Sequence, residues 1–293
     1  MAQLKKSISS GLRMNKDALK ELIERAFQED IQDGDHSSLA SVPTNEIGRA
    51  KLLVKQEGIL SGVDVAEFIF NHYDQEVTFI KNIYDGDPVT VGDVAFEVKG
   101  KAQSILACER ILLNCMQRMS GISTYTHFLN QKIKHTKAKL LDTRKTTPNF
   151  RLLEKEAVKI GGGMNHRFGL FDMVMLKDNH IDYAGGITQA IEKTSAYLRA
   201  NNLDLKVEVE VRNLEELQEV LTVGQVSRIM LDNFTIDHMN EAVNIIDGKY
   251  ETEASGGITE DDIAAYAETG VDYISVGALT HQVKSLDLSL KAC

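Results

Sequence analysis

The second half of the chain alternates short apolar runs with amphipathic segments, and this alternation limits the fold more than any other feature. The later apolar runs end at Glu210, Asp232, Ser255 and Gly277, so their ends are 22, 23 and 22 residues apart. This spacing matches the length of one strand–helix unit in a parallel α/β barrel. We predict strands within residues 138–143, 172–177, 205–211, 227–232, 250–255 and 272–277, and helices within 187–202, 213–221, 236–246 and 260–270.

The first half has a different sequence pattern, which indicates an α+β arrangement. Residues 16–103 combine an amphipathic helix, predicted over 17–30, with short strand-like runs and turn signals. The pattern changes beyond Gly121. We therefore predict one domain over 1–119 and a second domain over 120–293.

A helix that links the two domains is predicted over 104–119. Arg110, Asn114 and Arg118 follow one another at intervals of four residues, so they share one polar stripe of this helix. The apolar side is predicted to consist of Leu106, Ile111, Leu113 and Met116.

The charge of the chain excludes one class of partner and points to another. With 43 acidic and 33 basic residues, the formal net charge is −10, whereas nucleic acid binds cationic surfaces. Between residues 143 and 167 the balance is reversed, which indicates a site for a small anion. Three of these side chains, at helical spacing, fit a solvated helix face equally well: Arg151, Lys155 and Lys159. The other basic residues of the segment are Arg144, Lys145, His166 and Arg167.

Location and redox chemistry are constrained by what the sequence lacks. The first 17 residues have no apolar run of the kind found in a secretory signal, and no stretch approaches the ~20 apolar residues of a membrane span. We expect a cytoplasmic protein without a membrane partner. Cys108, Cys115 and Cys293 form no CxxC pair, so neither a disulfide framework nor a zinc site is indicated.

The run at 205–211 places two carboxylates in the predicted barrel. Alternation sends its valines to one face and Glu208 and Glu210 to the other. Since helices surround a barrel, the glutamates should point inward, where Glu210 needs a cation, a hydroxyl group or a metal. The alternative is an exposed edge strand.

Cations and glycines follow the predicted strands. Arg144 offers a planar fork for a carboxylate or phosphate, and Lys145 a compact charge. The glycines at 161–163 would let backbone N–H groups approach an anion. Lys177 adds another cation. We expect His166, next to these cations, to be a neutral hydrogen-bond donor.

A second glycine pair, Gly256 and Gly257, follows Ser255, and Gly277 closes the next strand. Glycines at the last two strands of a barrel form a recurrent phosphate cradle. The carboxylates of Glu210 and Asp232 suit a hard ion such as Mg²⁺, held mainly through substrate phosphates. The other histidines show no metal-ligand spacing.

At this point the motifs resemble a known family. TRKTTP, GGGMNHR, LKDNH, VEVEV, LDNF, SGGI and SVGALTH, in this order, are similar to those of quinolinate phosphoribosyltransferase (nicotinate-nucleotide pyrophosphorylase). In the first half, EDIQDGD, KQEGILSGVDVAEFIF and CERILLNCMQRMSGIST resemble the family as well. The resemblance covers Glu29 to His281. One departure is Asn149, where the family usually has glycine, although asparagine tolerates the left-handed backbone.

The resemblance implies a fold and a reaction. It implies an N-terminal α/β sandwich domain, an incomplete parallel α/β (TIM-like) barrel, and a C-terminal tail that packs back on the N-terminal domain. The implied reaction transfers phosphoribose from PRPP to quinolinate, with Mg²⁺, and yields nicotinate mononucleotide, pyrophosphate and CO₂. It also implies a homodimer with a shared active site, or a higher homo-oligomer, in which Arg110 is given across the dimer.

The resemblance further implies the site residues. Lys145, Glu210 and Asp232 are the expected catalytic residues, and the last two are also possible Mg²⁺ ligands. Quinolinate is expected to be bound by Arg110, Thr143, Arg144, Lys145, His166, Arg167 and Lys177. PRPP is expected to be bound by Lys177, Glu210, Asp232, Ser255, Gly256, Gly257, Ser275, Val276 and Gly277.

Two other readings remain open from the sequence. A paralogous phosphoribosyltransferase acting on another base would share most of these motifs. A non-catalytic phosphate-binding barrel would bind PRPP without turnover.

Overall fold

The computed structural model describes residues 14–293, which divide into two compact units. The first unit contains the chain up to Gly121 together with residues 148–157 and 284–293. The second contains residues 122–147 and 158–283. The prediction that the chain begins without a secretory signal concerns mainly residues 1–13, which lie outside the described residues.

The first unit is built on an antiparallel sheet in the order β12-β1-β5-β3. A two-stranded sheet pairs β2 with β4. The strands of the first unit are β1 (Ile47–Val54), β2 (Gly58–Ile59), β3 (Thr78–Lys81), β4 (Pro88–Val89), β5 (Val94–Lys101) and β12 (Leu288–Ala292). Its helices include α1 (Lys16–Asp30), α2 (His36–Ser41) and α3 (Val63–Tyr73), and α4 (Ala102–Ile133) begins in it.

Aromatic packing joins α3 to the sheet of the first unit. Phe70 of α3 lies 6.0 Å from Phe79 of β3 and 6.4 Å from Phe96 of β5, measured between ring centroids. Phe70 and Phe96 are fully buried. Tilted and edge-to-face ring pairs of this kind add to the stabilisation from buried apolar area.

Helix α4 differs from the helix predicted over 104–119. It runs on to Ile133 through Gly121, because burial of the neighbouring Ser120, Ile122 and Ser123 outweighs their modest helix propensity. The predicted stripe is confirmed at Arg110 and Asn114, which are exposed. The prediction for Leu106 is wrong: this side chain is 43% exposed, whereas Ile111, Leu113 and Met116 are buried.

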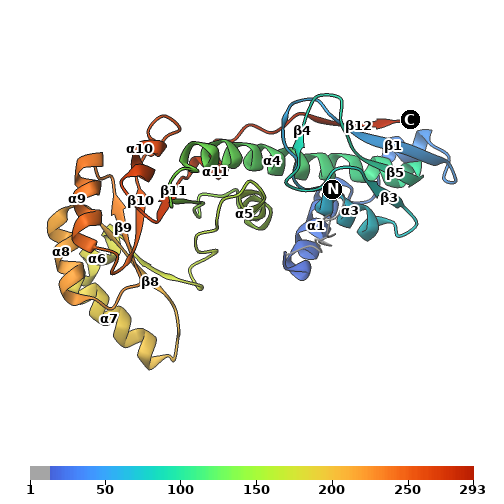
Figure 1. Ribbon diagram of the computed structural model, residues 1–293. Coiled ribbons are helices and arrows are strands. Elements are labelled where there is room, and N and C mark those ends of the chain that lie inside the picture. The colour runs from blue at the N-terminus through green and yellow to red at the C-terminus, as the bar shows by residue number, and fades with distance from the viewer. Residues whose placement is uncertain (1–13) are drawn as a thin grey trace, which may run out of the picture. The chain divides into compact units, whose positions relative to one another are not determined.

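The second unit is a six-stranded parallel sheet in the order β6-β11-β10-β9-β8-β7. The end strands β6 and β7 do not pair with each other, so the expected incomplete α/β barrel is confirmed. Figure 1 shows α7, α8 and α9 along the outer side of the strands. The strands are β6 (Lys139–Leu141), β7 (Val174–Leu176), β8 (Val207–Val211), β9 (Arg228–Asp232), β10 (Glu251–Ser255) and β11 (Tyr273–Ser275). The helices are α6 (Asp178–Ala184), α7 (Ile187–Ala200), α8 (Leu214–Val223), α9 (Ile236–Ile246), α10 (Ile263–Glu268) and α11 (Ala278–His281).

Every strand predicted in the second half contains an observed one, and the four predicted helices correspond to α7, α8, α9 and α10. The edge-strand alternative for 205–211 is wrong, since β8 pairs with both β7 and β9. Helix α5 (Arg151–Ile160) crosses from one unit to the other. On α5 the solvated-face alternative fails for Lys155, which is 2% exposed.

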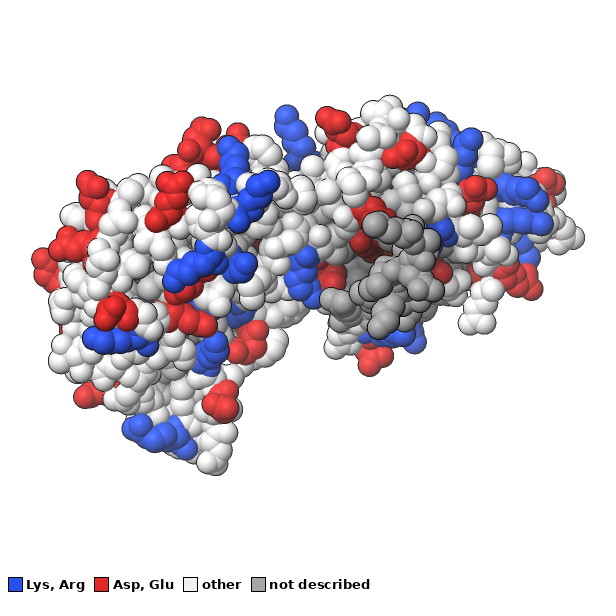
Figure 2. Space-filling model, in the orientation of Figure 1, with Lys and Arg blue, Asp and Glu red and all other residues white. Residues whose placement is uncertain are grey.

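The surface carries both signs of charge. Over the face shown in Figure 2, acidic and basic side chains of the described residues are interspersed. Among residues 14–293, no helix combines the length and the apolar character needed to cross a bilayer.

The C-terminal strand completes the sheet of the first unit. Leu288 pairs with Val54 and Leu290 with Leu52, in antiparallel register with β1. Leu288 is 3% exposed and Leu290 is 6% exposed. The tail is therefore part of the core of this unit.

Replacing Leu288 by alanine should lower the free energy of unfolding by about 2–5 kcal/mol, since it removes buried methyl groups and leaves a cavity. The measurement is chemical denaturation. The control is Lys291→Ala on the exposed end of the same strand, which should change stability by less than about 0.5 kcal/mol. Equal losses in both variants would contradict a packing role for β12.

Candidate active site

The ends of the parallel strands bring several predicted site residues together. Lys177 follows β7, and its Nζ lies 3.7 Å from Oε2 of Glu210, near the end of β8. Glu210 is 8% exposed. Burial raises its pKa, and the nearby carboxylate of Asp232 raises it further. Lys177 is therefore the cation that the sequence leads us to expect beside Glu210.

Asp232 and Ser255 are aligned in the pairing of β9 with β10. The Asn233 amide donates to the Ser255 carbonyl at 2.9 Å, and the Asn233 side chain donates to Asp232 Oδ2 at 2.6 Å. Gly256 has φ +102°, and a Cβ there would clash with Asn233 Oδ1. Glycine is thus required at 256, both by its backbone conformation and by this close approach.

The next strand end approaches the loop after β6. The Thr280 hydroxyl donates to the Lys145 carbonyl at 2.7 Å, and a Cβ on Gly277 would lie 3.1 Å from Lys145 Cδ. Ser275 and Val276 are buried, and the Val276 amide is already bonded to Leu141. Lys145 therefore lies beside the predicted phosphate cradle.

Two predicted quinolinate ligands are close enough to influence each other. Burial lowers the pKa of Arg167, and the positive charge of Arg144 lowers it further. Arg167 Nη1 donates to the Met173 carbonyl at 3.1 Å. An anion bound near both guanidinium groups would relieve this repulsion.

Asp142 organises the loop that carries Arg167. It is fully buried and accepts hydrogen bonds from the Asn165 side chain at 2.6 Å and from the His166 amide at 2.8 Å. Thr143, the next residue, accepts a hydrogen bond from the Lys145 amide at 3.0 Å. Both basic loops of the site are thus tied to the end of β6.

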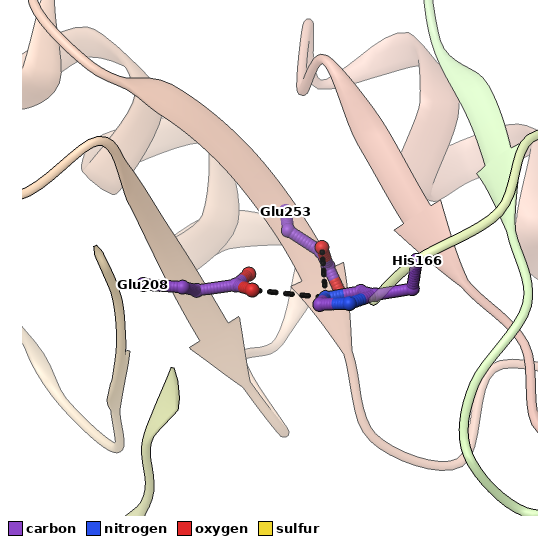
Figure 3. Close-up of side chains that lie close together, drawn as sticks. All are labelled: His166, Glu208 and Glu253. Carbon is purple, nitrogen blue, oxygen red and sulfur yellow. Dashed lines mark ion pairs between the residues drawn. The ribbon is translucent and has the colours of Figure 1, made fainter. Parts of the chain in front are cut away.

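His166 lies in the barrel interior rather than among the cations. Its Nε2 is 2.9 Å from Glu208 Oε2 and 3.3 Å from Glu253 Oε2, and Figure 3 shows both carboxylates directed at the ring. Burial lowers the pKa of His166, but its hydrogen bonds to the two glutamates outweigh this and raise the pKa to about 9. The expectation that neighbouring cations disfavour a proton on His166 is wrong.

The contact at the other ring nitrogen, Nδ1, indicates which nitrogen of His166 carries the proton. The Arg167 amide lies 2.6 Å from Nδ1, and an N–H group donates only to an unprotonated nitrogen. The raised pKa favours a second proton, whereas this contact excludes one from Nδ1. The direct contact decides for Nδ1, so the proton of His166 lies on Nε2, which faces the two carboxylates. Its contact with a substrate carboxylate stays a prediction.

His166, Glu208 and Glu253 are also close enough together to hold a metal ion, since one ligand atom of each lies within 4.8 Å of the others. The proton on Nε2 argues against it, because a metal would need that nitrogen bare. The carboxylates of Glu210 and Asp232 fit a divalent ion better. They lie near enough for Asp232 to raise the pKa of Glu210, and a cation between them would relieve this repulsion.

The triple glycine has a different role from the one predicted. The Gly162 amide donates to Lys159 and the Gly163 amide to Val158, so both serve the end of α5 rather than an anion. A Cβ on Gly161 would lie 2.5 Å from the Ser123 carbonyl oxygen. These glycines allow close packing, and the anion-binding interpretation is wrong for these two N–H groups.

Sequence reasoning missed Arg228 and Glu253. Arg228 Nη1 donates to Glu253 Oε2 at 2.9 Å, and its guanidinium lies 4.0 Å from the Tyr273 ring centroid. The sequence carries a signal for Glu253. Glutamates alternate with other residues at 251 and 253, as they do at 208 and 210. Arg110, unlike the other predicted site residues, belongs to the first unit.

Comparison with known proteins agrees with the motifs. Models of the N-terminal and C-terminal domains of quinolinate phosphoribosyl transferase match residues 35–120 and 122–291. The chain belongs to the quinolinate phosphoribosyltransferase family. It is 46% identical over 288 residues to quinolinate phosphoribosyltransferase [decarboxylating] 1b of Nicotiana tabacum, covering 93% of this chain and 82% of the relative.

Other members of the quinolinate phosphoribosyltransferase family extend the similarity. A chloroplastic nicotinate-nucleotide pyrophosphorylase [carboxylating] of Arabidopsis thaliana is 45% identical, over 93% of this chain and 82% of the relative. The crystal structure of NadC from Streptococcus pyogenes superposes with a TM-score of 0.90 at 38% identity, covering 96% of this chain and 98% of that one. The two-domain fold is therefore that of the family.

Asp142→Asn should destabilise the second unit by about 1–3 kcal/mol, because an amide group would face two donors with one acceptor fewer. Chemical denaturation measures the loss. Asp204→Asn, an exposed change in the same unit, serves as the control and should behave like wild type. Equal stability of the two variants would show that Asp142 does not organise the loop.

Proposed function

We propose that the protein transfers phosphoribose from PRPP to the ring nitrogen of quinolinate and releases pyrophosphate and CO₂, forming nicotinate mononucleotide for NAD biosynthesis. The family membership supports this reaction. The observation that carries it is that Arg144 lies near enough to Arg167 to lower the pKa of that guanidinium, because like charges in proximity favour an anionic ligand. Quinolinate, with two carboxylates, is such a ligand.

The quinolinate site is proposed around these two arginines. Arg144 and Arg167 can each present a guanidinium fork to a carboxylate. Thr143, Lys145 and Lys177 complete the proposed set in the second unit, next to His166, and Arg110 is supplied from the first unit of the partner subunit of a homodimer.

The PRPP site is proposed at the strand ends. Ser255, Gly256, Gly257, Ser275, Val276 and Gly277 lie where two parallel strands end, which suits the 5-phosphate. Glu210 and Asp232 would hold Mg²⁺ together with PRPP oxygens, and the ion would neutralise negative charge on the pyrophosphate.

The reaction separates charge, and the proposed site matches that separation. As the ribose C1–O bond breaks, positive charge develops on the ribose and the electron pair leaves with pyrophosphate. Carboxylates at Glu210 and Asp232 stabilise the first charge, and Lys145 or Lys177 stabilises the second. The quinolinate nitrogen then bonds to C1. The pyridinium ring accepts the electron pair when the C2–carboxylate bond breaks, and C2 takes up a proton in place of CO₂.

The direct test is to incubate the purified protein with quinolinate, PRPP and Mg²⁺ and to measure nicotinate mononucleotide. Product should form only when all three are present. Product formed with another pyridine carboxylate but not with quinolinate would favour the paralogous reading. PRPP binding without any product would favour the non-catalytic reading.

Arg144→Ala should raise the KM for quinolinate roughly tenfold to a hundredfold, because a charge-assisted contact is lost. The free protein should not become less stable, since the repulsion between Arg144 and Arg167 is removed. Steady-state kinetics and thermal denaturation measure the two effects. The exposed Arg199→Ala in the same unit is the control, and a quinolinate KM unchanged by Arg144→Ala would contradict the assignment.

A shared active site predicts complementation between two inactive variants. Mixing Arg110→Ala with Lys177→Ala subunits should restore activity, because one site of a hybrid dimer would then carry both native side chains. Subunit exchange is verified with differently tagged chains. Absence of recovery despite exchange would show that Arg110 does not act across the dimer.

We also propose a cytoplasmic location. The sequence supports this location, but the chloroplastic relative shows that family members occur elsewhere.

A further inference from the structure

The interior of the barrel holds charged side chains to which the proposed reaction assigns no role. Glu208 and Glu253 are fully buried, and Arg228 is 7% exposed. A barrel interior is ordinarily filled by branched apolar residues. Apolar replacement of buried ion pairs is often neutral or stabilising, so packing alone does not account for these charges.

These charges converge on one edge of the His166 ring. Glu208 reaches Nε2 from β8 and Glu253 reaches it from β10, at 2.9 and 3.3 Å (Figure 3). Arg228 of β9 contacts the same oxygen of Glu253, with Nη1 2.9 Å from Oε2. The ring is thus contacted from β8 and β10, and its Nε2 faces two carboxylates at ion-pair distance.

The opposite edge of the ring holds the backbone of the next residue. Nδ1 accepts the Arg167 amide at 2.6 Å, and the His166 amide is itself bonded to Asp142 at 2.8 Å. A rotation of the ring would break the contacts on both edges. The carboxylates in the barrel interior are therefore connected, through one rigid ring, to the start of the Arg167 side chain.

We propose that Glu208 and Glu253 are positioning residues for substrate binding. They fix the His166 ring so that its Nδ1 holds the Arg167 amide and directs the guanidinium toward a carboxylate of the aromatic substrate. Small errors in the placement of a binding group weaken substrate binding strongly. This inference rests on the proposed function for its kinetic consequence, but not for the contacts themselves.

Direct binding of substrate by His166 Nε2 leads to the opposite expectation. If the glutamates compete with substrate for this N–H group, removing either one frees the donor and lowers the KM or leaves it unchanged. If they position Arg167, removing either one raises the KM. The sign of the change separates the two roles.

A matched pair of variants on β10 tests the positioning role. Glu253→Ala removes an acceptor of His166. Glu251→Ala removes a glutamate two residues earlier, which also binds Arg228, at 3.1 Å, but is not a partner of His166. Glu253→Ala should raise the KM for quinolinate roughly tenfold, with kcat and the KM for PRPP changing less than about threefold. Glu251→Ala should leave all three unchanged within the same limit.

A second pair at Glu208 keeps the test valid if Glu253→Ala does not fold. Glu208→Ala should raise the quinolinate KM, and Glu208→Gln should restore it, because the amide oxygen still accepts the Nε2 proton. A double-mutant cycle adds a further condition. Once Arg167 is replaced by Ala, Glu208→Ala should have no additional effect on this KM.

Hydrogen exchange of the Arg167 amide tests the contacts without substrate. The amide should exchange faster in Glu208→Ala and Glu253→Ala than in wild type, and at the wild-type rate in Glu251→Ala. Equal exchange and equal KM in Glu253→Ala and Glu251→Ala would overturn the inference, as would a KM loss of the same size for both substrates. Absence of nicotinate mononucleotide formation in the wild type, with this exchange pattern intact, would overturn the proposed function alone.

Discussion

The alignment of β8, β9 and β10 decides what each charged side chain in the barrel can contact. Arg228 is paired in register with Glu208 on one side and with Glu251 on the other. Four residues further along β9 and β10, Asp232 is aligned with Ser255. A slip of one residue would turn every one of these side chains to the opposite face, toward the helices. The apolar residues between them, such as Val209 and Leu231, are fully buried and hold this register.

Within this frame, the interior carboxylates lie next to donors, whereas like charges approach one another in the candidate active site. Arg228 neutralises Glu253, and His166 supplies a donor to both buried glutamates. In the candidate active site, the negative charge of Asp232 raises the pKa of Glu210, and the positive charge of Arg144 lowers the pKa of Arg167. Like charges brought together in this way destabilise the free protein slightly, and they are the groups that a ligand of the opposite charge would stabilise. The site is prepared by the fold before any ligand arrives.

The sequence predicts the strands and their polar ends well, because alternation and the 22-residue spacing report directly on a parallel barrel. It fails where a residue's partner comes from elsewhere in the chain. His166 was placed among the cations adjacent in sequence, but its ring is turned toward Glu208 and Glu253 on distant strands. The glycines at 161–163 look like an anion site, but the packing against Ser123 that requires Gly161 has no local signal. Asn149 shows the opposite case: its φ of +62° follows from local backbone preference, and it was predicted.

The interior charges have a physical consequence for how the binding loop is held. An apolar core would fix the strands, but it would offer the loop after α5 only contacts without direction. Hydrogen bonds impose both a distance and an orientation, and in a dry interior an unsatisfied donor is costly, so a rotated ring would be strongly disfavoured. His166 converts this directional restraint into the position of the Arg167 amide. The burial of two glutamates, which by itself opposes folding, thereby specifies where a cation of the proposed quinolinate site begins.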